Sequence, residues 1–206
     1  KGHLEIAEKL IAKGADPNKA NKDGWTPLYI AIDKGHLEIA EKLIAKGADI
    51  SLKDSSGNKA IDIASGRGQL EIVKLLENVE KQNKLLFNAV SQHEKINIQS
   101  ALKNGAQVNC LDEFNKTVLY LAASMGEINI VTTLLDEGAN PNIANKDGCT
   151  PLYVAIHKGH LDIVEQLIAK GVDLDIANKD GFTPLYEAID KGHLEIAEKL
   201  IAKGAD

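Results

Sequence analysis

Apolar residues in the stretch DGWTPLYIAIDKG recur with the spacing of a short helix. Leu28, Ala31 and Ile32 fall at positions i, i+3 and i+4, which gives the segment one apolar face. Thr26 is a suitable N-cap, and Pro27 suits the first helical position because the N–H that proline lacks would have no partner there. The pattern predicts an amphipathic helix that the following glycine ends after about two turns.

The residues that follow, HLEIAEKLIAKGAD, predict a second helix. Ile39, Ala40, Leu43 and Ile44 form its apolar stripe, and Gly47 supplies the left-handed residue that ends many helices. The next residues are few, polar and include glycine, which is typical of a projecting turn. The unit is therefore predicted to be helix, turn, helix and finger, where finger denotes the projecting turn.

This unit recurs along the chain with a period of 33 residues and one shorter step. Equivalent alanines of the first helices are separated by 33, 25, 33, 33 and 33 residues, namely Ala31, Ala64, Ala89, Ala122, Ala155 and Ala188. One unit cannot fold by itself, because about eight buried apolar side chains at roughly 1.5–3 kcal/mol each do not offset ~1–2 kcal/mol of backbone entropy per residue. The units are therefore predicted to stack on one another.

The unit DGWTPLYIAIDKGHLEIAEKLIAKGAD resembles the ankyrin repeat. The matching positions are Gly24, Thr26, Pro27, Leu28, Ala31, Gly35, His36, Leu37, Ile39, Leu43 and Gly47. The pattern recurs at 147–173 and 180–206, and more loosely at 56–80 and 114–140. The resemblance implies an all-α solenoid of stacked helix-turn-helix units with projecting β-hairpin or loop fingers.

One departure from the family pattern is systematic. The histidine that usually follows Thr-Pro-Leu is replaced by tyrosine at Tyr29, Tyr153 and Tyr186. The hydrogen bonding of that turn is therefore left open by the resemblance.

The short step lies in the segment LLENVEKQNKLLFNAV, which contains neither glycine nor proline. Eight residues, the length of a finger, are missing there. The repeat before it resembles the last repeat of an ankyrin array, and the repeat after it resembles a first one. We expect residues 1–80 to be the end of one array, with a partial repeat and two repeats, and residues 81–206 to begin a second array, with a cap-like repeat and three more. The alternative is one continuous stack that lost a finger.

Composition limits the classes of partner and compartment. The 30 acidic and 24 basic residues give a net charge of −6 without any basic block, which argues against nucleic acid as a partner. No apolar run approaches the roughly 18 residues of a membrane span, and the first residues lack the regions of a signal peptide. Two cysteines, Cys110 and Cys149, are too few for a disulfide framework, which favours a cytoplasmic, reducing location.

Candidate catalytic and metal-binding groups are absent from the pattern. Four histidines occupy the same turn position, where a ring can cap the second helix, namely His3, His36, His160 and His193. Because stacked repeats lie about 10 Å apart, these rings are too far from one another to bind one metal ion. Paired acids such as Glu38 and Glu41 belong to an outer, solvated face. The sequence predicts no catalytic residues, no metal and no cofactor, and the chain is interpreted as no enzyme by itself.

Positions that differ among near-identical repeats are not needed for the fold and indicate a binding surface. In ankyrin proteins the residue after the finger glycine and the pair that ends the first helix face the concave groove. The candidate partner-binding residues at these positions are Trp25, Asp33, Lys34, Asn58, Arg67, Lys116, Met125, Cys149, His157, Lys158, Phe182, Asp190 and Lys191. Trp25 and Phe182 are the candidate anchors, since aromatic residues are enriched at interface hot spots. Packing on neighbouring fingers is the alternative for these two rings.

The resemblance implies a protein–protein interaction module that binds a polypeptide through the concave groove. One alternative is a segment of a larger bacterial effector, toxin or multidomain enzyme whose catalytic domain lies elsewhere, with the cytosol of a host cell as its location. A second is an engineered repeat binder, which the exact copies of KGHLEIAEKLIAKGAD at 1–16, 34–49 and 191–206 favour and the irregular SQHEKINIQS opposes.

Overall fold

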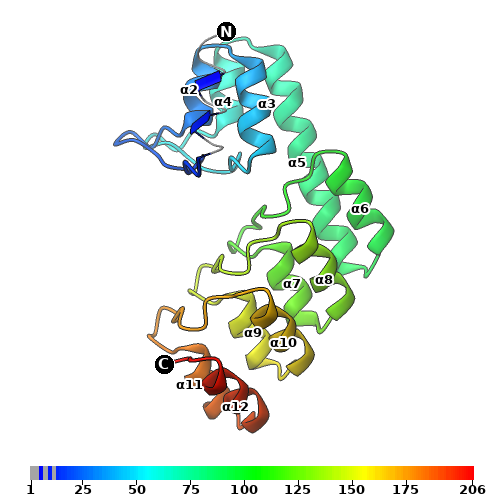
Figure 1. Cartoon of the computed structure of the whole chain (residues 1–206). Helices are drawn as coiled ribbons and strands as arrows, with labels where there is room; N and C mark the ends of the chain where they lie inside the picture. The colour runs from blue at the N-terminus through cyan, green and yellow to red at the C-terminus, as the bar shows by residue number, and fades with distance from the viewer. Residues whose placement is uncertain (1–4, 7–8, 11–12) are drawn as a thin grey trace. The chain divides into compact units, whose positions relative to one another are not determined.

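The computed structural model describes residues 5–6, 9–10 and 13–206 of the chain (Figure 1). The described residues form eleven helices and no extended strand, as the all-α prediction requires. The helices are α2 (Pro27–Asp33), α3 (Leu37–Ala45), α4 (Ala60–Gly66), α5 (Leu70–Ser91), α6 (Lys95–Lys103), α7 (Val118–Met125), α8 (Ile128–Asp136), α9 (Pro151–His157), α10 (Leu161–Ala169), α11 (Pro184–Asp190) and α12 (Leu194–Ala202).

Contacts within the chain define two compact units. The first comprises the described residues up to Leu85 together with Ala101–Gln107, and the second comprises Leu86–Ser100 with Val108–Asp206. In the first unit α2 packs on α3 and α4. In the second unit the first helices α7, α9 and α11 pack side by side, and α8, α10 and α12 form a second layer beside them (Figure 1).

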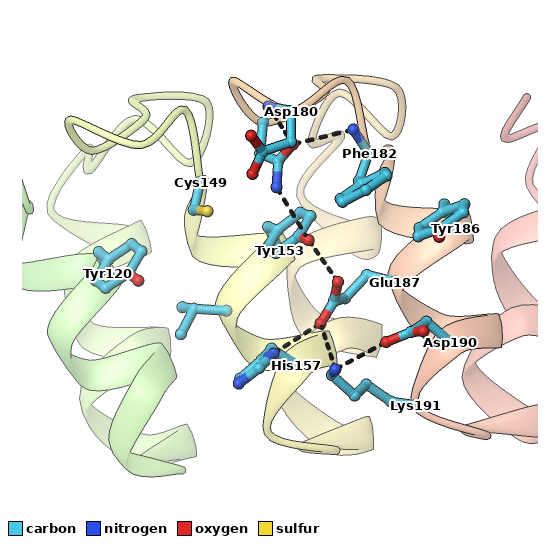
Figure 2. A pocket seen from close by; sticks show the side chains of 12 residues that line it. Tyr120, Cys149, Tyr153, His157, Asp180, Phe182, Tyr186, Glu187, Asp190 and Lys191 are labelled. Carbon is cyan, nitrogen blue, oxygen red and sulfur yellow. Dashed lines mark hydrogen bonds and ion pairs between the residues drawn. The ribbon is translucent and has the colours of Figure 1, made fainter.

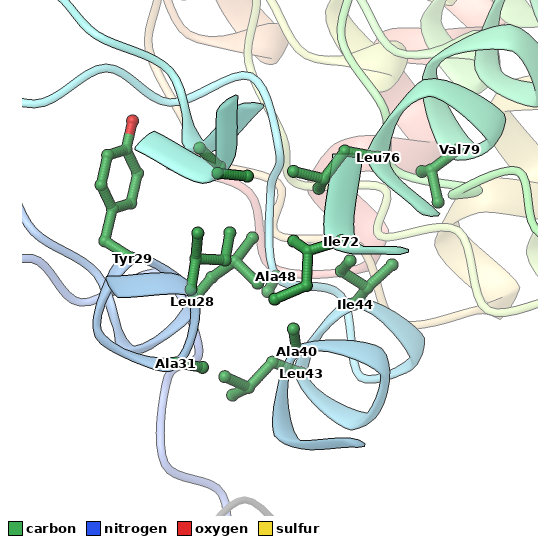
Figure 3. Close-up of a cluster of buried hydrophobic side chains, with 13 residues drawn as sticks. Leu28, Tyr29, Ala31, Ala40, Leu43, Ile44, Ala48, Ile72, Leu76 and Val79 are labelled. Carbon is green, nitrogen blue, oxygen red and sulfur yellow. The ribbon is translucent and has the colours of Figure 1, made fainter. Parts of the chain in front are cut away.

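The core of each unit is aliphatic, as the apolar pattern predicts. Leu28, Ala31 and Ile32 of α2 are buried with Leu43 of α3 and Leu76 of α5 in the first unit (Figure 3). The second unit buries the equivalent residues of its repeats, among them Leu119, Leu134, Leu152, Ile156, Ile163 and Leu167. The predicted faces of the helices are therefore confirmed at these positions.

The threonine before each first helix acts as an N-cap in the second unit. The hydroxyl of Thr150 accepts a hydrogen bond from the backbone N–H of Tyr153 at 3.2 Å, and the hydroxyl of Thr183 accepts one from Tyr186 at 3.3 Å. Thr26 occupies the same position, but its buried hydroxyl has no hydrogen-bond partner among the described residues. Thr26 is therefore the N-cap residue of α2, as predicted, but its hydroxyl makes no capping bond to a described residue.

The histidines before the second helices pack against the preceding repeat. A Cβ added to Gly126 would lie 2.9 Å from Cε1 of His160, and one added to Gly159 would lie 2.9 Å from Cε1 of His193. Neither His160 nor His193 makes a side-chain capping bond within the described part of the chain. The prediction that these rings cap the helices is wrong, because the glycine of the neighbouring repeat leaves room for the ring. His3 lies outside the described residues.

Each finger is closed by one Asn or Asp side chain. Its Oδ1 atom accepts hydrogen bonds from the backbone N–H groups two and four residues later, as in an Asx turn, at Asn21, Asp54, Asp112, Asn145 and Asn178. Adjacent fingers are joined through the backbone, since the N–H of Lys179 donates to the carbonyl of Asp147 at 2.9 Å. These bonds fix the residue that follows each finger glycine.

The short step of the repeat is spanned by one helix. The 22-residue α5 joins the second helix of one repeat to the first helix of the next, where the other repeats have a finger. The loop after α6 is held within the first unit. The side chain of Gln107 donates to the carbonyl of Ala48 at 2.7 Å, and its backbone N–H donates to the Asn83 side chain at 2.7 Å. The division into two arrays stays a prediction.

Candidate functional site

Two of the hollows in the described part of the chain lie over predicted residues, one in each unit. The N-terminal hollow, of about 280 Å³, brings together the predicted residues Trp25, Asp33, Asn58 and Arg67. The C-terminal hollow, of about 410 Å³, brings together the predicted residues Cys149, His157, Phe182, Asp190 and Lys191 (Figure 2). Residues that are far apart in the sequence thus line common surfaces.

The N-terminal hollow is held by ion pairs across two repeats. The guanidinium of Arg67 at the end of α4 donates to a carboxylate oxygen of Asp33 at the end of α2. Lys34 Nζ lies 2.9 Å from the other oxygen of Asp33, whose side chain is only 8% exposed. The hydrogen bond from Lys34, together with the bond and charge of Arg67, outweighs burial and lowers the pKa of Asp33. Asp33 is therefore ionised at neutral pH and its charge is compensated.

Trp25 lines the same hollow, and its ring lies close to that of a buried tyrosine. The half-buried Trp25 ring lies 6.3 Å, between ring centroids, from the buried ring of Tyr29. The Tyr29 hydroxyl lies within hydrogen-bond distance of the carbonyl oxygens of Leu52 at 2.7 Å and Asn58 at 2.6 Å, and its single proton serves one of them at a time. This contact supports the base of the next finger. Burial, followed by the charge of Asp54, raises the pKa of Tyr29 to about 12, so its hydroxyl is a donor at neutral pH.

The C-terminal hollow is built around the buried carboxylate of Glu187, on α11, which is 5% exposed. One oxygen accepts a hydrogen bond from the hydroxyl of Tyr153, on α9. The other lies 2.7 Å from Nδ1 of His157, and Lys191 Nζ lies 3.7 Å away (Figure 2). The Tyr153 hydroxyl in turn accepts a hydrogen bond from the Asn178 side chain at 3.2 Å. The network joins a finger to two first helices.

These contacts keep Glu187 charged. Burial by itself would raise the pKa of Glu187, but the hydrogen bonds from Tyr153 and His157 and the positive charge of Lys191 outweigh burial, so the pKa of Glu187 lies below its ordinary value. Burial and the hydrogen bond to Glu187 raise the pKa of Tyr153, which keeps its hydroxyl protonated. The hollow therefore presents an anion at neutral pH.

One wall of the C-terminal hollow is aromatic. The rings of Phe182 and Tyr186 are stacked, with their centroids 4.4 Å apart and their planes 6° from parallel. Phe182 is 38% exposed, and Tyr186 is also exposed. Asn178 fixes this wall, because its side-chain oxygen accepts the N–H of Phe182 at 3.0 Å. Phe182 thus stacks on a ring of its own repeat, and the pair remains accessible to a partner.

The other predicted residues lie outside these two hollows. Lys116 Nζ is 5.3 Å from the ring centroid of Phe114 and 5.7 Å from that of Tyr120. Met125 is half-buried at the end of α7, and Lys158 is exposed after α9. Lys34 pairs with Asp33, as described, but does not line the N-terminal hollow. The thirteen predicted residues are therefore distributed over more than one surface.

The described residues form no cluster suited to a metal ion, and the environment of Cys149 does not favour a nucleophile. Within the described part of the chain, no three or more His, Cys, Asp or Glu side chains are placed to hold a metal ion. Burial, followed by the charges of Asp147 and Glu187, raises the pKa of the Cys149 thiol, so this sulfur is not a thiolate at neutral pH. None of the described helices combines the length and apolar character of a membrane span.

The repeat pattern has a counterpart among known families. A family model described as ankyrin repeats (3 copies) matches residues 1–85, 77–145 and 129–206. The chain belongs to the ankyrin repeat family. Ankyrin repeats are generally protein–protein interaction modules, and ankyrin repeat domains are typically non-catalytic. No curated protein matches the sequence.

Within this ankyrin fold, sequence reasoning missed Glu187 and Tyr153. Glu187 occupies the helix position at which the other Thr-Pro-Leu-Tyr repeats carry Ile30 and Val154. The replacement of an aliphatic residue by a carboxylate was visible in the sequence. Its partner was not, because Tyr153 belongs to the preceding repeat and meets Glu187 only when the helices stack.

Proposed function

We propose that this ankyrin chain binds a polypeptide partner in the two hollows formed by its first helices and fingers. The observation that carries the proposal is that nine of the thirteen residues predicted from their repeat positions line these hollows: Trp25, Asp33, Asn58, Arg67, Cys149, His157, Phe182, Asp190 and Lys191. The residue after the finger glycine differs among the repeats that line the hollows, as Trp25, Asn58, Cys149 and Phe182 show, and variation outside the core is typical of a recognition surface.

The proposed anchors are accessible rings held in fixed positions. Phe182 is stacked on Tyr186, and the backbone N–H of Trp25 donates to the side chain of Asn21 at 2.9 Å. A partner residue that covers a preordered ring gains apolar burial and orders little of the receptor. Charged groups beside each ring, Asp33 and Lys191, supply specificity and association rate rather than most of the affinity.

We also propose that the module has no catalytic activity and works in the cytoplasm. The raised pKa of the Cys149 thiol is unfavourable for a nucleophile. Neither Cys110 nor Cys149 forms a disulfide within the described chain, which suits a reducing compartment.

The proposal is tested with a random peptide library displayed on phage and selected on the immobilised chain. A selected peptide is then titrated calorimetrically against the chain and its Trp25→Ala and Phe182→Ala variants. The control is Glu198→Ala, on the exposed face of α12. We expect at least one aromatic variant to lose tenfold or more in affinity, while the control matches the parent chain. Equal affinities for all four proteins would contradict the proposal.

A further inference from the structure

We propose that the C-terminal hollow binds an arginine side chain of the partner polypeptide, an inference that rests on the function proposed above. The carboxylates of Glu187 and Asp190 receive the guanidinium, and the stacked rings of Phe182 and Tyr186 lie beside it (Figure 2). The hollow of about 410 Å³ is open to solvent on one side and large enough for such a side chain.

The carboxylate of Glu187 retains hydrogen-bonding capacity. A carboxylate offers about four lone-pair sites. Tyr153 uses one oxygen and His157 uses the other, each through a single hydrogen bond. The remaining acceptor sites belong to a charged group that is almost completely buried and that lines the hollow. A donor that enters the hollow therefore finds a preordered anion whose orientation is already fixed.

A cation of the chain already occupies the edge of this anionic site. Lys191 Nζ lies 2.8 Å from a carboxylate oxygen of Asp190 and 3.7 Å from one of Glu187, and its side chain is 36% exposed. The pair with Asp190 joins two partly exposed side chains and is therefore weak and easily opened, and the contact with the buried Glu187 is long. Lys191 therefore acts as an internal substitute for a ligand cation, and an incoming guanidinium displaces it into solvent.

The balance of charge in the hollow favours a cation. The lining includes Asp180, Glu187 and Asp190, against Lys191 and the ring of His157. Cys149, also in the lining, is a neutral thiol. An acidic side chain would meet this excess of carboxylates, whereas a basic one compensates it.

The aromatic wall selects arginine over lysine. A guanidinium is planar, stacks on aromatic faces and carries donors in a fork that can serve two carboxylates at once. The exposed Phe182–Tyr186 pair offers such a face beside Asp190 and Glu187. The ammonium group of lysine is compact and not planar. It cannot stack on an aromatic ring and donate to two carboxylates in a fork at the same time.

Glu187 is not required by the repeat. Equivalent helices carry Ile30 and Val154 at the same position, and burial of a carboxylate among apolar helices is unfavourable without compensation. In this repeat Tyr153, His157 and Lys191 supply the compensation. A compensated carboxylate at an aliphatic position is expected where its charge serves recognition.

The test uses the whole chain and three synthetic libraries of eleven-residue peptides with random flanks. The central residue is arginine, lysine or citrulline, the neutral isostere of arginine. We expect the arginine library to be retained on the immobilised chain at least fivefold more than either of the others. Glu187→Gln and Asp190→Asn each remove this preference, whereas Glu198→Gln, on the outer face of α12, preserves it.

The variant Lys191→Met should increase binding of the arginine library, whereas Glu187→Gln and Asp190→Asn should decrease it. Because Lys191→Met removes the competing cation and keeps an unbranched side chain only one atom shorter than lysine, it should raise retention of the arginine library two- to tenfold. Retention that falls in Lys191→Met overturns the assignment of Lys191 as an internal substitute. Asp190 and Lys191 are exposed, so their variants test the site even if Glu187→Gln does not fold.

The outcomes separate the two proposals. Retention of all three libraries without preference for arginine overturns this inference and leaves polypeptide binding in place. An arginine preference that survives both Glu187→Gln and Asp190→Asn also overturns the site. Retention of none of the libraries contradicts polypeptide binding itself, and with it this inference.

Discussion

The hydroxyl of Tyr153 donates a hydrogen bond to the buried carboxylate of Glu187, which lies 34 residues later and one repeat further along the stack. The two residues stand on neighbouring first helices, α9 and α11. The bond therefore couples the packing of two ankyrin repeats to the electrostatics of the hollow that we propose as a binding site.

Loss of this hydroxyl should destabilise the chain. Tyr153→Phe leaves Glu187 with one donor fewer in a buried place, and hydrogen bonds to charged groups contribute about 1.5–3 kcal/mol. We expect a decrease of that order in the free energy of unfolding, measured by urea denaturation. Tyr186→Phe is the control, because the Tyr186 side chain is exposed, and it should change stability by less than about 0.5 kcal/mol. Equal losses would show that the Tyr153 bond is not stabilising.

The charge of Glu187 should make the free energy of unfolding depend on pH in the acidic range. The pKa of Glu187 is lower in the folded chain than in the unfolded chain, so its contribution is complete above the unfolded value of about 4.3 and is lost as pH falls through the folded value. The difference in unfolding free energy between the parent and Glu187→Gln should therefore shrink as the pH falls below about 4. A difference that grows on acidification would contradict the lowered pKa, and Glu198→Gln serves as the exposed control.

The packing of His193 on Gly159 should be visible in alanine variants of two glycines. Gly159 has φ +72° and Gly192 has φ +71°, so alanine meets the same left-handed strain at both, about 1–2 kcal/mol. At Gly159 the new Cβ would also meet the His193 ring of the next repeat, whereas at Gly192 no described atom apart from those of its two chain neighbours lies within 4 Å. Gly159→Ala should therefore lower the thermal midpoint more than Gly192→Ala. In a His193→Ala background the two glycine variants should become equal, and a persistent difference would exclude the ring contact as its cause.

We propose that the chain divides into two arrays within α5, in the region 79–84. Lys81 and Lys84 are exposed, and the neighbouring positions have few buried apolar groups between Val79 and Leu86. Local opening is easiest where few apolar contacts hold a segment. Hydrogen exchange should therefore be faster for amides 80–85 than for the buried helices at Leu152 and Leu167. Equal protection at all these amides would argue for one continuous stack.

Local rules were sufficient for most of the fold. The apolar spacing around Leu28 and the proline at Pro27 predict α2 where it lies, and the same rules apply to each repeat. They failed where a neighbouring repeat decides the geometry. The ring of His193 packs on Gly159 of the neighbouring repeat instead of capping α12.

The candidate site shows the same limit. The position after the finger glycine led to Phe182, and the end of the first helix led to Asp190 and Lys191. Glu187 differed from its equivalents Ile30 and Val154, but nothing local indicates that Tyr153 reaches it. The stacking register of two helices creates that contact, and a pattern within one repeat does not contain it.

The most direct test of the central claim is photo-crosslinking with a peptide selected on the chain. Benzoylphenylalanine is placed in turn at Phe182, at Trp25 and, as a control, at Glu198 on the outer face of α12. After irradiation, mass spectrometry identifies the residues joined to the peptide. We predict crosslinks from position 182 or 25 and none from position 198. Crosslinks from position 198 with none from 182 or 25 would contradict binding in the hollows.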